Sequence, residues 1–375
     1  MKDDKVDYQR EFTREHLPLY QSLSPRICEL LGSVLSDAEI PVAQIEHRPK
    51  SVESFLAKLG RKAYSDPFKE IKDFAGIRVI AYYADDVPRV AQILRDEFEI
   101  DEANSTDKLE ELQVDEFGYR SYHLVCSLKP PRSKLTEWRQ YNDLCFEVQI
   151  RSVLQHAWAA ISHKLDYKSA KQAPKEVRRQ LFRLSALLEL GDQEFASIRD
   201  RSRTVVEEYR EDVDRGQLDI PLNVASLTEY LNERFDRDEW RQLGIAAGMR
   251  DPGGTSPSDI HTRLLFETLS EMGIGSLKEL DTLIAQNKRR APEILTSIVE
   301  ACEIEGSKVS ALPENLLNFF VAIAARERLP VNFTWGERWD PFLRDAMNEL
   351  LQKPRKRSKK KAQQEAEGDA EDRAP

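Results

Sequence analysis

Apolar residues recur three or four positions apart in the first part of the chain and on alternate positions further on. From residue 8 to 36, side chains such as Leu23 and Ile27 fall on one side of a helix. Pro25 lies inside this pattern and is expected to break or restart the helix. The run IRVIAYY at 77–83 is rich in β-branched and aromatic residues, which is typical of a buried strand.

Similar patterns continue to residue 168. They predict, in order, a helix at Val52–Lys62 after a short connecting segment, the strand at 77–83, a helix at Asp85–Phe98, a polar loop at 99–116, strands at Tyr119–Leu128 and Phe146–Ile150, and a helix at Val153–Lys168. Strands and helices that follow one another in this way indicate an α/β domain. We expect a mixed β-sheet flanked by helices.

The second half of the chain has helical patterns throughout. Residues 175–212 form one long amphipathic segment, and shorter helices separated by glycine and proline follow. Ser276 and Glu279 form a capping box that predicts the start of one of them. The chain is thus divided into an N-terminal helical segment (1–44), an α/β domain (45–170), a long helical extension (171–221), an all-helical C-terminal domain with no motif that carries chemistry (222–352) and a charged tail (353–375), which is too poor in apolar residues to fold.

Composition indicates a soluble protein with two domains or one large one. The chain has 375 residues, of which 33% are charged and 40% hydrophobic. It has no run of about 18 apolar residues and no apolar segment of a secretory signal near its start, so we expect a cytoplasmic protein with no membrane partner. The 4 cysteines form no CxxC pair and no zinc-type spacing. The net charge of −10 gives no sign of nucleic-acid affinity, although the basic run at 353–361 could contact RNA.

The segment from Glu147 to Lys168, EVQIRSVLQHAWAAISHKLDYK, combines a polar strand face with a helix that carries histidines. Alternate residues of a strand share a face, so Glu147, Gln149 and Arg151 point away from the apolar side. His156, His163 and Tyr167 share one face of the helix that follows. The strand suits the floor of a site, and the alternative is an antiparallel strand with a solvated face.

Three other segments carry complementary chemistry. HRPKSVESFLAKLGRK places Arg48, Lys50, Ser54, Lys58, Arg61 and Lys62 close together, as an anchor for polyphosphate would require, or as an ordinary basic helix surface. In DFAGIR, Asp73 precedes a small Ala-Gly pair that leaves room for Mg²⁺ and a triphosphate, unless it is a simple turn residue. In FGYRSYH, Tyr119, Ser121 and His123 share a strand face that suits stacking on a base, or a half-buried edge strand. Together the segments favour metal-assisted transfer of a phosphoryl-type group between nucleotides.

Four motifs in this order, RPKSxxS…K, DFAGIRV, GYRSYH and EVQIRSxxxHAWAxISHxxxYK, resemble the synthetase domain of the RelA/SpoT alarmone enzymes. The resemblance covers roughly residues 45–170 and is closest to the small, single-function members. It implies a nucleotidyltransferase-like mixed sheet flanked by helices. It also implies transfer of the β,γ-pyrophosphate of ATP to the 3′-hydroxyl of GDP or GTP, with Mg²⁺, to make the (p)ppGpp alarmone of the stringent response.

The resemblance also assigns roles to residues. Asp73 and Glu147 would carry catalysis and hold Mg²⁺; Arg48, Lys50, Ser54, Lys58 and Arg78 would bind ATP and its phosphates; Tyr119, Ser121, His123, Gln149, Arg151 and His156 would bind the acceptor. Small members of the family often assemble, so the helix at 175–212 is expected to be able to form a homo-oligomer.

One stretch departs from the family pattern. Residues 107–116, DKLEELQVDE, are mostly acidic where the family carries a basic stretch that holds the acceptor's 5′ phosphates. Some toxin-like relatives also lack that stretch and pyrophosphorylate the 3′ end of tRNA. Two alternatives therefore stand beside the alarmone synthetase: a tRNA-modifying toxin, and a catalytically dead nucleotide-sensing module.

Overall fold

The computed structural model describes residues 2–61, 63–107, 121–164, 174–251, 253, 259–304, 309–310, 312–335 and 341–352. Contacts between residues divide the chain into two compact units, Met1–Arg201 and Ser202–Pro375. The boundary falls inside a single helix, α8 (Lys175–Asp214). The five-part division made from the sequence stays a prediction, and its first three segments lie wholly or mostly within unit 1.

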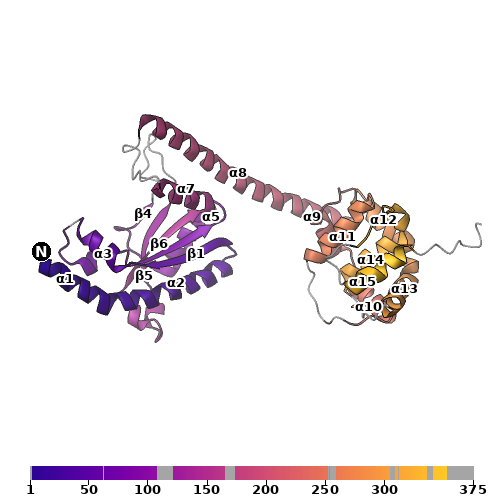
Figure 1. The fold of residues 1–375 in the computed structure, drawn as a ribbon, viewed down its shortest axis with the longest axis horizontal. Helices are drawn as coiled ribbons and strands as arrows, with labels where there is room; N and C mark the ends of the chain where they lie inside the picture. Colours follow the sequence, from indigo (N-terminus) through magenta and orange to yellow (C-terminus); the bar gives the residue numbers. More distant parts are fainter. Residues whose placement is uncertain are drawn as a thin grey trace, which may run out of the picture. The chain divides into compact units, whose positions relative to one another are not determined.

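Unit 1 contains a mixed sheet and the helices that flank it (Figure 1). Its strands are β1 (Val42–Pro49), β2 (Ala75–Ala81), β3 (Phe98–Ile100), β4 (Thr106–Asp107), β5 (Tyr122–Leu128) and β6 (Cys145–Ser152). Its helices before α8 are α1 (Lys2–Glu11), a π-helical turn (Phe12–His16), α2 (Leu17–Asp37), α3 (Val52–Leu59), α4 (Pro67–Glu70), α5 (Asp86–Glu97), short 3₁₀ turns at Arg132–Lys134 and Arg139–Tyr141, and α7 (Val153–Lys164).

The strand order is β1-β2-β6-β5-β3, and β4 pairs with β5. Only β2 and β6 run parallel among these pairs, and the rest are antiparallel. One face of the sheet is apolar, and its residues form a single core with buried side chains of α2 and α5, including Leu31 and Leu94. The structure thus confirms the expected mixed sheet flanked by helices. The opposite face is the one that carries polar residues.

Three expectations for single elements were wrong. Residues 42–49, expected to be a connecting segment, form the edge strand β1. One side of this strand faces the polar surface of the sheet, so its sequence lacks a clear alternation of apolar and polar residues. Within the expected loop at 99–116, short strands β3 and β4 pair with β5. Pro25 does not interrupt α2: it removes one backbone hydrogen bond, and the burial of Leu23 and Ile27 beside it offsets that loss.

The first part of α8 packs against the rest of unit 1 through apolar and polar contacts. Trp158 of α7 is 4% exposed and packs against Leu181 of α8. At the end of β6, the buried hydroxyl of Ser152 donates to a carboxylate oxygen of Asp192, 2.8 Å away. Arg199 donates to Asp85 at the start of α5 and lies over the ring of Tyr83. These contacts connect α8 to the end of β6, to α7 and to the segment at the start of α5.

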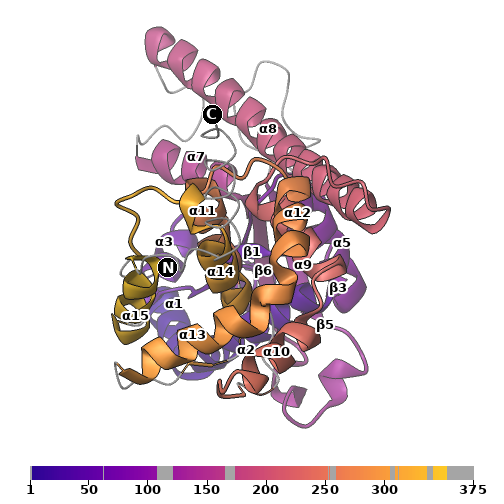
Figure 2. The ribbon, with the colours of Figure 1, turned by 90° about the vertical axis from the view of Figure 1, so that its right-hand side faces the viewer.

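Unit 2 is helical in the part that the structure describes. Its helices after α8 are α9 (Val224–Glu233), α10 (Arg237–Ala246), α11 (Asp259–Glu271), α12 (Leu277–Asn287), a 3₁₀ turn (Lys288–Arg290), α13 (Ala291–Ile304), α14 (Pro313–Ala324), a 3₁₀ turn (Arg326–Arg328) and α15 (Pro341–Gln352). α14 contacts α10, α11, α12, α13 and α15 and lies inside the bundle (Figure 2). Ser276 caps α12 by accepting from the Glu279 amide, as predicted, but the Glu279 carboxylate accepts from the Gly275 amide and not from that of Ser276, so only half of the predicted capping box is present.

No helix in the described ranges is long and apolar enough to cross a membrane. The tail at 353–375 lies outside the described residues. The homo-oligomer expected from the helix at 175–212 stays a prediction.

Candidate active site

A polar surface crosses the four strands β1, β2, β6 and β5. Strand register places Glu46, Arg78, Gln149 and His123 in one row across the sheet. The neighbouring row contains Arg48, Gly76 and Glu147. Since paired residues of adjacent strands point to the same face, these side chains share one surface. Gly76 has no side chain, so the floor stays open between Arg48 and Glu147.

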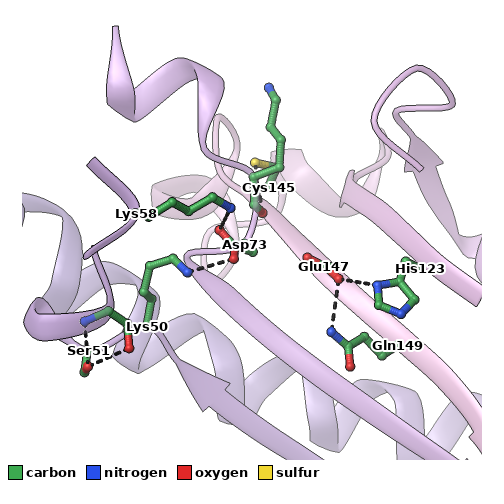
Figure 3. Close-up of polar contacts among 10 residues, drawn as sticks. Lys50, Ser51, Lys58, Asp73, His123, Cys145, Glu147 and Gln149 are labelled. Carbon is green, nitrogen blue, oxygen red and sulfur yellow. Dashed lines mark hydrogen bonds and ion pairs between the residues drawn. The ribbon is translucent and has the colours of Figure 1, made fainter. Parts of the chain in front are cut away.

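Asp73 lies just before β2 and meets two lysines from the segment after β1. Lys50 Nζ donates to Asp73 Oδ2 at 2.7 Å, and Lys58 Nζ donates to Asp73 Oδ1 at 2.8 Å (Figure 3). A hydrogen bond of 2.8 Å from the Lys50 amide to the Phe74 carbonyl holds the two segments together. Ser51 caps α3 by accepting from the Ser54 amide, and it orients the helix that carries Lys58.

The two lysines keep Asp73 ionised. Burial alone would raise the pKa of this carboxyl, because burial disfavours the charged form. Hydrogen bonds from Lys50 and Lys58, together with their charges, outweigh burial and lower the pKa of Asp73 below its ordinary value. Asp73 is therefore a carboxylate at neutral pH.

Glu147, in the middle of β6, has a second set of partners (Figure 3). Its Oε1 lies 2.8 Å from His123 Nδ1 and accepts from Gln149 Nε2 at 3.1 Å. Burial would raise the pKa of Glu147, but the hydrogen bond and charge of His123 outweigh burial and lower it. Because an ionised carboxylate can only accept, His123 donates through Nδ1.

A group of cations lies beside these carboxylates. Arg78 donates to Glu46 Oε2 at 2.9 Å. Burial lowers the pKa of Arg151, and the charge of Arg78 lowers it further. The same two causes, in that order, lower the pKa of His156, so its imidazole is neutral at pH 7. Like charges held this close favour an anion between them.

Four nitrogen atoms of this surface are buried without a hydrogen-bond partner among the described residues. They are Arg78 Nε, His123 Nε2, Arg151 Nε and His156 Nδ1. A buried polar atom without a hydrogen-bond partner costs on the order of 1–3 kcal/mol, so such groups usually mark a place that a ligand or water completes. Their concentration on one face of the sheet indicates a binding site there.

The carboxylates and cations border a cleft of about 310 Å³. It is lined by Glu46, Arg48, Lys50, Ser51, Ser54, Asp73, Gly76, Ile77, Arg78, Glu147 and Gln149. Most of the predicted site residues are among them. Lys58 and His123 lie beyond the lining but bond to the lining carboxylates.

Some predicted residues lie elsewhere. Ser121 precedes β5 and is 6% exposed, outside the lining of the cleft. Tyr119 and Tyr167 fall outside the described residues, as does the side chain of His163. Glu46 and Ser51 line the cleft and were not predicted. Glu46 stands two positions before Arg48, so recognising β1 as a strand would have placed both on one face.

The two carboxylates of the cleft, Asp73 and Glu147, suit Mg²⁺ better than a metal ion that takes all its ligands from protein side chains. Asp73 and Glu147 line the same cleft, and they are near enough that the charge of Asp73 acts to raise the pKa of Glu147. Across the described ranges, no group of three or more histidine, cysteine or acidic residues is close enough to hold a metal ion. Mg²⁺ commonly takes one or two carboxylates and completes its shell with water and substrate phosphates.

Comparison with known proteins agrees with this geometry. Residues 47–172 match the model of a region found in RelA / SpoT proteins. The chain is 34% identical over 166 residues to the GTP pyrophosphokinase YjbM of Bacillus subtilis (strain 168), which covers 44% of this chain and 74% of that protein. It is 27% identical over 163 residues to the GTP pyrophosphokinase YwaC of the same organism, which covers 42% of this chain and 74% of that protein.

Among solved structures, the small alarmone synthetase 1 from Bacillus subtilis aligns with 26% identity and a TM-score of 0.42, over 52% of this chain and 99% of that one. All residues that line the cleft except Glu46 lie within the region that matches the family. By the match of residues 47–172 and the similarity to YjbM, this chain belongs to the RelA/SpoT family of GTP pyrophosphokinases.

Proposed function

We propose that this protein transfers the β,γ-pyrophosphate of ATP to the 3′-hydroxyl of GDP or GTP. One observation carries the proposal: a single cleft is lined by the Asp73 carboxylate, which accepts from two lysines, and by a second ionised carboxylate, Glu147. The names of the relatives support a guanosine nucleotide as acceptor. The product would be a (p)ppGpp alarmone, the signal of the stringent response.

The donor would bind at the side of the cleft formed by β1 and α3. Arg48, Lys50 and Ser54 line this side, and Lys58 reaches it from the last turn of α3. Ammonium and guanidinium groups are suited to phosphate oxygens. Asp73 and Glu147 would hold Mg²⁺, which supplies neutralisation of the charge on the transferred phosphates.

The acceptor would bind toward β5 and the end of β6, where His123, Gln149, Arg151 and His156 lie. Its 3′ oxygen forms a bond to the β-phosphorus while the bond from that phosphorus to the oxygen bridging the α-phosphate breaks, and AMP leaves. Glu147 accepts the proton of the 3′-hydroxyl, and His123 keeps the Glu147 carboxylate in place. Since little covalent chemistry falls to the protein in phosphoryl transfer, orientation and charge are its main contributions.

A second candidate function is pyrophosphorylation of the 3′ end of tRNA. The observation that favours it is the acidic sequence at 107–116, which would repel the 5′ phosphates of a free guanosine nucleotide. The net charge of −10 opposes it, because binding of a nucleic acid depends on neutralising its phosphates. The guanosine nucleotide therefore ranks first.

The test is a transfer assay with the full chain, Mg²⁺ and γ-³²P-labelled ATP. GDP, GTP and deacylated tRNA are supplied separately, and release of AMP is measured by chromatography. We expect label on a guanosine nucleotide with one AMP formed per transfer, and none with Glu147→Ala. Label on tRNA alone would establish the second candidate, and no label on any acceptor with folded protein would refute both.

A further inference from the structure

Both oxygens of the proposed metal ligand Asp73 are occupied by ammonium groups. Lys50 Nζ lies 2.7 Å from one oxygen, and Lys58 Nζ lies 2.8 Å from the other. The Lys50 side chain is 11% exposed and the Lys58 side chain 36%, so these pairs are partly shielded from water. A divalent cation at either oxygen would lie beside two positive charges at close range, which is strongly unfavourable.

Release of both lysines from Asp73 is favoured when another anion receives their ammonium groups. Each ammonium ends a flexible four-carbon stem and has three donors that can turn to a new acceptor. Arg48, Ser51 and Ser54 border the cleft next to them, and none of these residues is an anion. The adjacent acids are already engaged, because Glu46 pairs with Arg78 and Glu147 with His123. The phosphates of a bound nucleotide are the anion that this side of the cleft lacks.

The protein also offers a metal too few ligands by itself. In the ranges that the structure describes, no three acidic, histidine or cysteine side chains are grouped so that they could hold a metal ion. Mg²⁺ in such a site depends on phosphate oxygens to complete its coordination. A bound triphosphate therefore favours metal binding in two ways: it draws the lysines from Asp73, and its oxygens complete the coordination of the metal.

We infer that Lys50 and Lys58 act as a clamp that closes the metal position in the nucleotide-free protein and opens it when a polyphosphate draws the ammonium groups away. This inference rests on the proposed function. Its consequence is positive coupling: a polyphosphate raises the affinity of the site for a divalent cation, and by thermodynamic linkage the cation raises the affinity for the polyphosphate by the same factor. Free divalent cations, in turn, bind the empty cleft weakly.

The test measures binding of Mn²⁺ to the full chain without nucleotide, by electron paramagnetic resonance. Lys58→Met removes one ammonium and keeps an unbranched side chain of similar length in the last turn of α3. We expect its dissociation constant for Mn²⁺ to fall about tenfold relative to the unsubstituted protein, the size of one charge-assisted hydrogen bond. Lys69→Met is the matched control, because Lys69 is 85% exposed and pairs with Asp66 outside the cleft.

A double variant, Lys58→Met with Asp73→Asn, identifies the position of the ion. The gain in Mn²⁺ affinity should disappear in it, and circular dichroism checks that each variant is folded. Equal Mn²⁺ affinity in Lys58→Met and the unsubstituted protein would overturn the inference. So would a gain that survives Asp73→Asn, or one that Lys69→Met also produces.

The binding experiment contains no acceptor and no transfer step, so it is separate from the assay of function. If Mn²⁺ binding responds as expected but no acceptor is labelled, the clamp stands and the proposed function fails. If a guanosine nucleotide is labelled but Mn²⁺ binding does not respond, the proposed function stands and the clamp fails.

Discussion

Replacing Glu147 with glutamine separates the role of its charge from its role in folding. Glutamine has the same shape, so its side-chain oxygen can still accept from His123 Nδ1 and Gln149 Nε2. Two charge-assisted hydrogen bonds become neutral ones, a loss of about 1 kcal/mol each. Glu147 is only 18% exposed, so removal of its charge also relieves a desolvation cost of comparable size. We expect a net change in the free energy of unfolding of no more than about 1 kcal/mol.

The effect on catalysis should be far larger. In the proposed reaction, Glu147→Gln would remove a charge that acts on the reacting hydroxyl and on the metal, and losses of this kind cost on the order of 3–4 kcal/mol in the transition state. That corresponds to a fall in kcat/KM of about 10² to 10³. The assay is AMP release with saturating Mg²⁺, with thermal unfolding followed in parallel by circular dichroism.

The control is Glu99→Gln, on the exposed edge strand β3 and outside the cleft. We expect this variant to retain the activity and melting temperature of the unsubstituted protein. A Glu147→Gln protein whose kcat/KM lies within about threefold of the control would refute the assignment of a catalytic role to this carboxylate.

Three further predictions concern other parts of unit 1. Because the pKa of Asp73 is lowered in the folded protein, its ionised form stabilises the fold at pH values above the ordinary aspartate pKa, and this stabilisation is lost as the pH falls through the lowered pKa. In urea titrations, the free energy of unfolding should therefore fall less between pH 7 and pH 3 in Asp73→Asn than in the unsubstituted protein. Tyr119→Ala should raise KM for the acceptor more than KM for ATP, and equal increases would count against stacking on the acceptor base. Trp158→Ala should lower the free energy of unfolding of unit 1 by about 3 kcal/mol in urea titrations, since it empties the contact between α7 and α8; a change below about 1 kcal/mol would show that this contact carries little stability.

Periodicity was a good guide where one side of an element is fully buried. The strand with Glu147 alternates strictly between buried and partly exposed residues, and this period placed Glu147, Gln149 and Arg151 on one face correctly. β1 has no such contrast, because it lies at the edge of the sheet and none of its residues is fully buried. The register of β1 against β2 brings Glu46 next to Arg78, and the sequence alone does not reveal which residues of the two strands pair.

Single motifs identified the residue types of the site but not their partners. The sequence indicated cations near Lys50 and a carboxylate at Asp73, yet their separation along the chain gave no sign that two lysines share that one carboxylate. The same is true of His123 and Glu147, which antiparallel pairing of β5 and β6 brings together. Ser121 shows the opposite case, since alternation suggested a site residue and burial places it outside the cleft lining.

The hydrogen bond between Ser152 and Asp192 sets a lower limit on the piece of chain that can maintain this site. Ser152 ends β6, and a slip of β6 by one residue would turn Glu147 into the apolar core. The family match ends at residue 172, but the partner of Ser152 and the apolar cover of Trp158 come from α8, at Asp192 and Leu181. A protein cut at the end of the family match would leave a buried hydroxyl without its acceptor and expose an indole ring. A fragment that keeps these contacts of β6 and α7 therefore has to extend into α8, beyond the region that sequence similarity delimits.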